Sequence, residues 1–139
     1  MPNFSGVWDL REQGVAVKGD RWQKTLPLAA NMGVVMGGYG TASNIESRSI
    51  EYLDIASGGN GTLFGELVTA AVYGGTCSST TKGFYAGGYT GSARVNVIQT
   101  VTYASTGGST DFGDLSHAPM QSEACSSTTR GVFAGGDDG

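Results

Sequence analysis

The chain has 139 residues, enough for about one ordinary domain, and 24 of them are glycine. Charged residues make up 14% of the chain, hydrophobic residues make up 39%, and the formal net charge is −4. Long helical proteins and coiled coils are built from Ala, Leu, Glu, Lys and Arg, so this composition excludes them. Disordered chains carry fewer hydrophobic residues, and general nucleic-acid binders carry clustered Lys and Arg. The composition therefore predicts a turn-rich, all-β protein.

Residues 1–30 differ in composition from the rest of the chain. They contain four of the eight basic residues and both tryptophans, and they contain no Gly-Gly pair. Asp9 and Glu12 resemble a helix-capping pattern, which predicts a short helix near residues 10–18. Tryptophan side chains bury large apolar areas. The segment is therefore expected either to cap an open end of the fold or to anchor the chain on a larger assembly.

From residue 33 onward the sequence repeats with a period close to 50 residues. The opening motif reads GVVMGG at 33–38, GFYAGG at 83–88 and GVFAGG at 131–136. Two further motifs recur in the same phase, LFGEL at 63–67 with DFGDL at 111–115, and CSSTTK at 77–82 with CSSTTR at 125–130. Three motifs that recur in one order indicate a structural repeat.

Each repeat is expected to hold short strands joined by turns. Three apolar residues between glycines are typical of a strand buried on both faces. Residues 50–55 and 98–103 mix apolar and polar side chains, as partly covered strands do. Residues 57–61 and 105–109 have the composition of turns.

One aromatic residue in each repeat stands in front of a glycine. Phe64 and Phe112 are expected to fill the space between neighbouring sheets. Gly65 and Gly113 are expected to turn the chain immediately behind them.

A repeat of this length with a Gly-Gly strand matches the blade of a kelch-type β-propeller. Closed propellers use about four to eight four-stranded blades. This chain holds two whole units, 33–82 and 83–130, and the opening strand of a third. Two blades cannot close a ring and would leave apolar sheet faces exposed. The chain must therefore associate, unless the fold is not a propeller.

The sequence CSSTTRGVFAGG, preceded by TDFGDL, resembles kelch-like repeats of virion structural proteins of tailed bacteriophages, especially cyanophage-like ones. The opening of the chain resembles a short module that begins many phage tail and surface proteins. That module has a G-x-W element and a second Trp about 14 residues later. Here FSGVWDL at 4–10 and Trp22 match it.

The resemblance implies a virion protein, and two roles stay open. The first is a capsid cement or decoration protein on the head surface, with a major capsid protein or another virion protein as its partner. The second is a tail or fibre adhesin that binds host glycans, for which Tyr39, Tyr73 and Tyr89 are candidate contacts. An adhesin usually needs a long shaft, so the first role is preferred. The expected capsid-anchor residues are Phe4, Trp8, Leu10 and Trp22.

The sequence contains no constellation that predicts an enzyme, a metal site or a cofactor. Cys77 and Cys125 occupy equivalent positions in successive repeats, and we expect two small buried hydrophobes rather than a disulfide or metal ligands. His117 has no second His or neighbouring Cys and is expected in a loop. Some kelch-like propellers carry oxidase chemistry, but this chain lacks the ligand set. No G-x-S-x-G elbow is present.

These observations divide the chain into an anchor segment, 1–30, and a two-blade propeller unit, 31–139. A dimer would supply four blades, a trimer six and a tetramer eight, and the resemblance favours the six-bladed homotrimer. The extra strand at 131–135 is expected to complete a blade of the next subunit. Its subunit-closure residues are Val132, Phe133 and Ala134.

Overall fold

The computed structural model describes residues 31–40, 45–137 and 139. Those residues form eleven β-strands and no helix, which confirms the all-β prediction. The strands are β1 (Met32–Met36), β2 (Tyr39–Gly40), β3 (Ile45–Glu46), β4 (Ser49–Asp54), β5 (Thr62–Glu66), β6 (Gly75–Ser78), β7 (Lys82–Ala86), β8 (Val97–Thr102), β9 (Thr110–Asp114), β10 (Glu123–Ser126) and β11 (Gly131–Ala134). No membrane-spanning helix occurs in this part of the chain. The predicted helix at 10–18 and the predicted anchor residues Phe4, Trp8, Leu10 and Trp22 lie outside the described residues.

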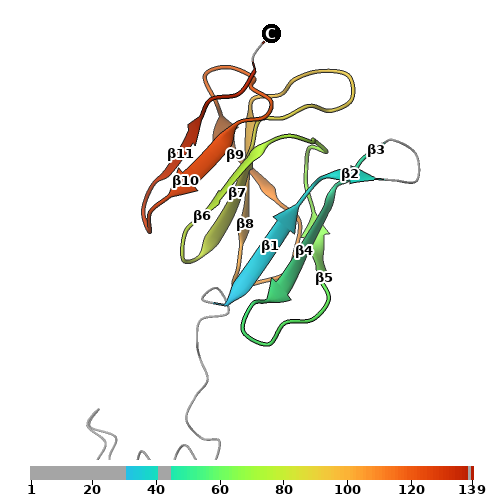
Figure 1. Ribbon diagram of the computed structural model, residues 1–139, viewed down its shortest axis with the longest axis vertical. Helices are drawn as coiled ribbons and strands as arrows, with labels where there is room; N and C mark the ends of the chain where they lie inside the picture. The colour runs from blue at the N-terminus through green and yellow to red at the C-terminus, as the bar shows by residue number, and fades with distance from the viewer. Residues whose placement is uncertain (1–30, 41–44, 138) are drawn as a thin grey trace, which may run out of the picture.

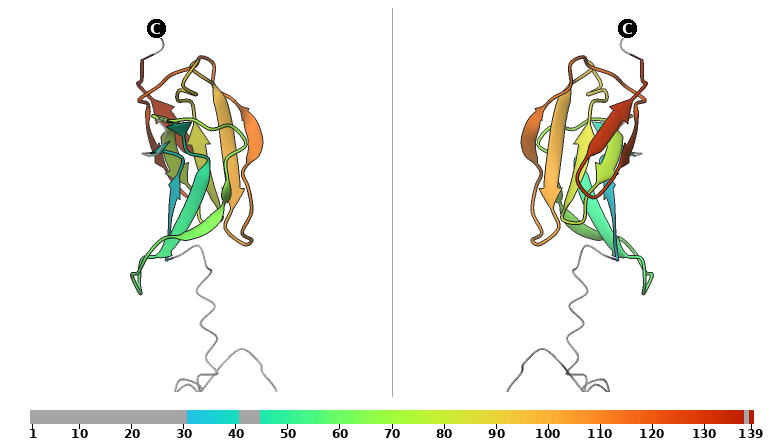
Figure 2. Two further views of the ribbon diagram at one scale, coloured as in Figure 1. Left: turned by 90° about the vertical axis from the view of Figure 1, so that its right-hand side faces the viewer. Right: turned by 90° about the vertical axis from the view of Figure 1, so that its left-hand side faces the viewer.

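The strands form four antiparallel sheets, of which the largest has the order β6-β7-β8-β9. A three-stranded sheet has the order β1-β4-β5, and β10 and β11 form a hairpin. The small β2–β3 hairpin lies beside the three-stranded sheet. Figure 1 shows the four-stranded sheet between the β1-β4-β5 sheet and the β10–β11 hairpin, and most strands run along the long axis in both side views of Figure 2. The described residues do not form a closed propeller.

The sequence repeat coincides with a repeat of strands. The Gly-Gly motif forms β1, β7 and β11, and the Cys-containing motif forms β6 and β10. By the same correspondence β4 matches β8, and β5 matches β9. The four-stranded sheet therefore begins with the Cys77 strand, β6, rather than with the Gly83 strand that opened the unit inferred from sequence.

The repeated CSSTT motif ends in the same turn twice. The Ser79 hydroxyl accepts hydrogen bonds from the backbone N–H groups of Thr81 and Lys82, at 3.2 and 3.1 Å. Ser127 repeats this geometry with the N–H groups of Thr129 and Arg130, at 3.3 and 3.1 Å. A serine hydroxyl that satisfies two backbone donors fixes the turn between two strands. This requirement explains the serine at the third position of both motifs.

Gly65 and Gly113 do not turn the chain, contrary to the sequence-based expectation. Both lie inside strands, β5 and β9, each opposite a register shift of the neighbouring strand. These irregularities are β-bulges, which bend a strand without ending it. Gly65 also lies against the backbone of Gly107, so the position has no room for a Cβ atom. The glycine therefore permits close approach of two backbones rather than a turn.

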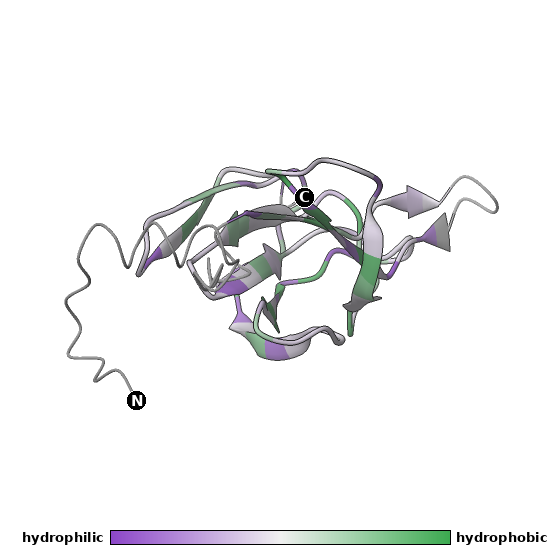
Figure 3. Cartoon of the chain, turned by 90° about the horizontal axis from the view of Figure 1, so that it is seen from below, coloured by the Kyte–Doolittle hydropathy of each residue, from purple (hydrophilic) through white to green (hydrophobic). Residues whose placement is uncertain are grey.

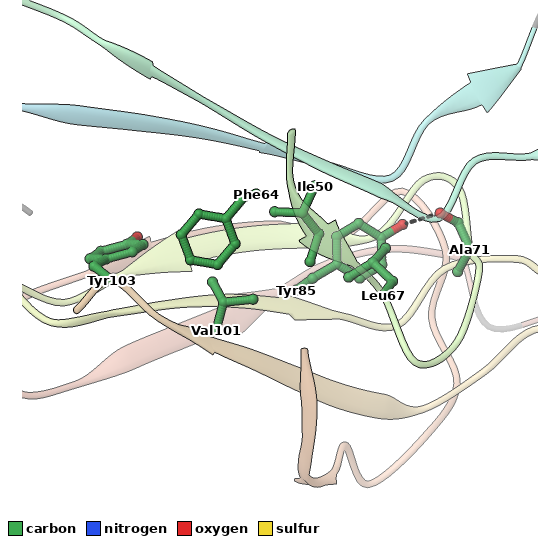
Figure 4. Close-up of a cluster of buried hydrophobic side chains, with 7 residues drawn as sticks. All are labelled: Ile50, Phe64, Leu67, Ala71, Tyr85, Val101 and Tyr103. Atoms are coloured by element: carbon green, nitrogen blue, oxygen red, sulfur yellow. Dashed lines mark hydrogen bonds between the residues drawn. The ribbon is translucent and has the colours of Figure 1, made fainter. Parts of the chain in front are cut away.

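The hydrophobic core lies between the β1-β4-β5 sheet and the β6–β9 sheet, an interface that we call the closed interface (Figure 4). The first sheet and the loop after it contribute Ile50, Phe64, Leu67 and Ala71, and the second sheet contributes Tyr85, Val101 and Tyr103. The Tyr85 hydroxyl donates a hydrogen bond to the Ala71 carbonyl at 2.8 Å. Burial of these apolar faces is the main stabilising contribution to this fold.

Candidate functional site

A cavity lies on the opposite face of the β6–β9 sheet, beside the β10–β11 hairpin. It has a volume of about 380 Å³, and we call it the C-terminal hollow. Its apolar wall consists of Phe84, Ile98, Phe112 and Phe133, and its rim consists of Cys77, Ser78, Ser79 and the 126–131 loop. All four strands of the sheet and both strands of the hairpin therefore border the hollow.

Two of the aromatic rings on the wall pack against each other. The ring centroids of Phe84 and Phe112 are 5.2 Å apart and the ring planes meet at 77°. This edge-to-face arrangement is a favourable one for aromatic side chains. Even so, Phe112 is 59% exposed. The pair therefore presents a pre-ordered apolar surface rather than a completed core.

The repeat gives every residue of this wall a counterpart in the closed interface. Phe112 corresponds to Phe64, which is only 5% exposed, and Ile98 corresponds to Ile50, which is fully buried. Corresponding side chains of the repeat therefore lie in the core at the closed interface and on the surface at the C-terminal hollow. Figure 3 shows apolar and polar segments along the strands. Because the paired residues are identical, Ile with Ile and Phe with Phe, the difference in exposure does not arise from a change in hydropathy.

The hairpin that covers part of the hollow is held by polar contacts to the β6–β9 sheet. The Ser126 hydroxyl donates to the Ser78 carbonyl at 2.6 Å and accepts from the Ser78 N–H at 3.3 Å. Beyond β11, the Arg94 guanidinium pairs with the Asp137 carboxylate at 2.9 Å. An exposed ion pair contributes little, about 0–1 kcal/mol. The hairpin is thus fixed in position with little apolar burial.

Both cysteines lie near this hollow as free thiols. Burial raises the pKa of the Cys77 thiol, and the neighbouring Cys125 thiol raises it further. A raised pKa reduces the thiolate fraction, and the thiolate is the nucleophilic and metal-binding form. Cys77 is half-buried, whereas Cys125 is exposed, so the expectation of two buried hydrophobes is wrong for Cys125. The described residues hold no group of His, Cys, Asp and Glu side chains arranged to bind a metal ion.

The other predicted site residues are dispersed. His117 lies in a loop, as expected, with Nδ1 at 3.0 Å from the Ser116 hydroxyl. Tyr39 and Tyr73 are exposed and Tyr89 is half-buried. None of these tyrosines borders the C-terminal hollow.

The predicted subunit-closure residues occupy both faces of the hairpin. Phe133 lines the hollow, Val132 is exposed on the other face, and Ala134 is exposed at the end of β11. In this structure β11 pairs with β10 of its own chain. Its pairing with another subunit stays a prediction.

Sequence reasoning did not single out Phe84 or Ile98 as site residues. Their positions in the repeat could have identified them. Phe84 is the second residue of the recurring glycine motif, and Ile98 is the counterpart of Ile50. The chain matches no protein-family model, and no curated protein is similar to it at a significant level.

Proposed function

We propose that this protein is a structural component of a virion, a cement or decoration protein that stabilises the head shell. In this proposal the chain works by packing apolar sheet faces against other chains, and it performs no catalytic step. The observation that carries the proposal is the exposure of Phe112, 59% against 5% for its counterpart Phe64. A side chain that the repeat places in a core is here available to a partner.

The residues that resemble phage repeats support the proposal, because they border this surface. Phe112 comes from TDFGDL, and the 126–131 loop and Phe133 come from CSSTTRGVFAGG. The proposed partners are further copies of the chain, which form a six-bladed homotrimer, and a major capsid protein. Attachment to the capsid is assigned to residues 1–30 through Phe4, Trp8, Leu10 and Trp22.

The proposal is tested by co-sedimentation of the full chain with purified heads of the virus that carries it. We expect the wild-type chain to bind heads and to raise the temperature at which they open. The double variant Trp8→Ala/Trp22→Ala should lose binding, whereas the control variant Tyr89→Phe, outside residues 1–30, should retain it. Wild-type chain that stays in the supernatant would contradict the proposal.

A second candidate function is glycan binding by a tail or fibre adhesin. The observation that favours it is the combination of three phenylalanine rings with a rim of serine and threonine hydroxyls in one hollow. Aromatic faces and hydroxyl groups are both contacts that sugars use. Binding of a host-surface oligosaccharide that Phe112→Ala abolishes, without binding to heads, would favour this function.

A further inference from the structure

The first sheet carries a second apolar surface, on the face that points away from the core. In β1 and β4, Met32, Val34, Met36 and Tyr52 pack against the core, so the alternate residues point the other way. Val35 is 59% exposed, and Ile55, directly after β4, is 66% exposed. Gly33 lies opposite Leu53 in the register and leaves room between Leu53 and Ile55. We call Val35, Leu53 and Ile55 the N-terminal face.

The repeat relates this face to the closed interface. Val35 corresponds to Tyr85, Leu53 to Val101 and Ile55 to Tyr103. These three counterparts are buried against Ile50, Phe64 and Leu67. The counterparts of Ile50, Phe64 and Leu67 are in turn Ile98, Phe112 and Leu115, on the other side of the β6–β9 sheet. The N-terminal face of the first sheet therefore resembles one side of the closed interface. The hollow side of the β6–β9 sheet resembles the other side.

We infer that the C-terminal hollow binds the first sheet of a second copy of this chain, with the N-terminal face of that copy against Ile98, Phe112 and Leu115. This inference deepens the proposed function, since it rests on association being how the chain works, and it names the partner surface. The occupant is a second copy because the closed interface within each chain already shows this pairing of faces.

Backbone groups support the same docking. In the closed interface, Gly107 N–H donates to the Phe64 carbonyl and Ser109 N–H donates to the Glu66 carbonyl, both at 2.9 Å. The counterparts of Gly107 and Ser109 are Gly59 and Gly61, in the exposed turn after β4. Docking of the second copy brings their N–H groups to the Phe112 and Asp114 carbonyls on β9. That strand is the edge of its sheet in this structure.

Docking also identifies which strand is displaced. β1 of the second copy and β11 of the first copy are counterparts, so the two strands require the same position beside β10. β1 pairs with β4 over five residue pairs, whereas β11 pairs with β10 over four and has only Phe133 partly covered. We therefore expect β11 to leave its position beside β10, which β1 of the second copy then occupies. The strand passed to the next subunit is then β10, in place of the 131–135 strand expected from sequence.

The contact is head-to-tail, because two different faces meet. Such contacts form rings when the rotation closes, as the propeller arrangement requires. A head-to-tail contact has a specific signature: a variant damaged in one face can still bind a variant damaged in the other, but neither can extend further.

The test uses the full chain, 14.2 kDa, in size-exclusion chromatography with light scattering. Val35→Lys damages the N-terminal face and Phe112→Lys damages the hollow. Both side chains are 59% exposed, so neither change removes a core residue. We expect the wild type to be oligomeric, each variant alone to be monomeric, and the equal mixture of the two to form dimers. Val68→Lys, at an exposed apolar residue outside both faces, should remain oligomeric.

Deletion of residues 131–139 provides an independent measurement, because it removes β11 and leaves β10. We expect the deleted chain to associate at least as well as the wild type. Loss of association would instead assign the closing role to β11 and overturn the displacement.

Three further outcomes would overturn the inference. A wild-type chain that is monomeric at every concentration leaves no second copy in the hollow, although binding to heads could persist and sustain the proposed function. Association that Val35→Lys abolishes and Phe112→Lys does not would indicate a symmetric contact between two first sheets. A mixture of the variants that stays monomeric would exclude the head-to-tail contact. Circular dichroism of each variant, matching the wild type, shows that the fold is intact.

Discussion

The two sides of the β6–β9 sheet use the same repeated residues and reach different degrees of burial. On one side Ile50, Phe64 and Leu67 form a core with Tyr85 and Val101. On the other side Ile98 and Phe112, the counterparts of Ile50 and Phe64, line a hollow of about 380 Å³. The difference lies in the number of strands that each neighbour supplies, three in the first sheet and two in the hairpin. Burial in a repeat protein therefore depends on the neighbouring repeat as much as on local sequence.

The largest expected difference between the two interfaces comes from truncating the two equivalent phenylalanines, Phe64 and Phe112. Phe64→Ala should destabilise the chain by about 3–5 kcal/mol, because it opens a cavity in the closed interface. Phe112→Ala should cost about 1 kcal/mol or less, since its ring is 59% exposed. Urea unfolding of the two variants, measured at a protein concentration where the chain is monomeric, gives both values. Equal losses would show that the two interfaces are equally closed.

The next effect concerns a hydroxyl group that only the closed interface contains. Tyr85 donates to the Ala71 carbonyl and accepts from the Gly74 N–H at 3.0 Å, whereas its counterpart is Phe133. Tyr85→Phe leaves both backbone groups without this partner and should cost about 1–3 kcal/mol. Tyr89→Phe removes an exposed hydrogen bond to the Gly91 carbonyl and should change stability by about 0.5 kcal/mol or less.

The substitution Tyr85→Phe should also change how stability depends on pH. Burial raises the pKa values of Tyr85 and Tyr103. The unfolded chain therefore loses these protons at lower pH than the folded chain does, and stability falls as the pH rises above about 10. The decline should be shallower in Tyr85→Phe, which retains only Tyr103. An unchanged alkaline slope would contradict the burial of the Tyr85 hydroxyl.

The smallest expected effect concerns one side-chain hydrogen bond at the contact between two copies. In the closed interface the buried Gln99 side chain accepts from the Thr69 N–H and donates to the Thr69 carbonyl, both at 2.9 Å. When a second copy docks, its Glu51 takes the place of Gln99, and His117 of the first copy takes the place of Thr69. A carboxylate accepts but cannot donate. Glu51→Gln should therefore lower the dissociation constant about fivefold, the effect of one net hydrogen bond. Analytical ultracentrifugation measures it, and weaker association would contradict the pairing.

Much of the fold could be predicted from the sequence, because the motifs that recur also fix local geometry. The Gly-Gly pairs illustrate this: Gly37, Gly87 and Gly135 have φ values of 67°, 70° and 69°. A side chain is strained at such angles, so glycine recurs where the backbone conformation recurs. The Phe64 prediction was also correct, since that ring fills the space between two sheets.

The rest could not be predicted, because periodicity does not reveal where a sheet begins or what covers its last face. A repeat read from Gly33 or from the Cys77 strand has the same period, yet only the second choice matches the four-stranded sheet. Phe112 has the same local sequence as Phe64 and a different exposure. The distinguishing quantity, the number of strands that pack against each face of the β6–β9 sheet, is not a property of the motif.

The weak attachment of the β10–β11 hairpin affects where a protease first cuts the chain. The hairpin has the Ser78–Ser126 contacts and the Arg94–Asp137 ion pair but little apolar cover. Regions of this kind open at low free energy, while the rest of the fold stays intact. Arg130 is exposed in the turn of the hairpin and is a cleavage site for a trypsin-like protease once the turn opens. We therefore expect limited digestion with trypsin to cut first after Arg130, while strands β1 to β9 stay folded.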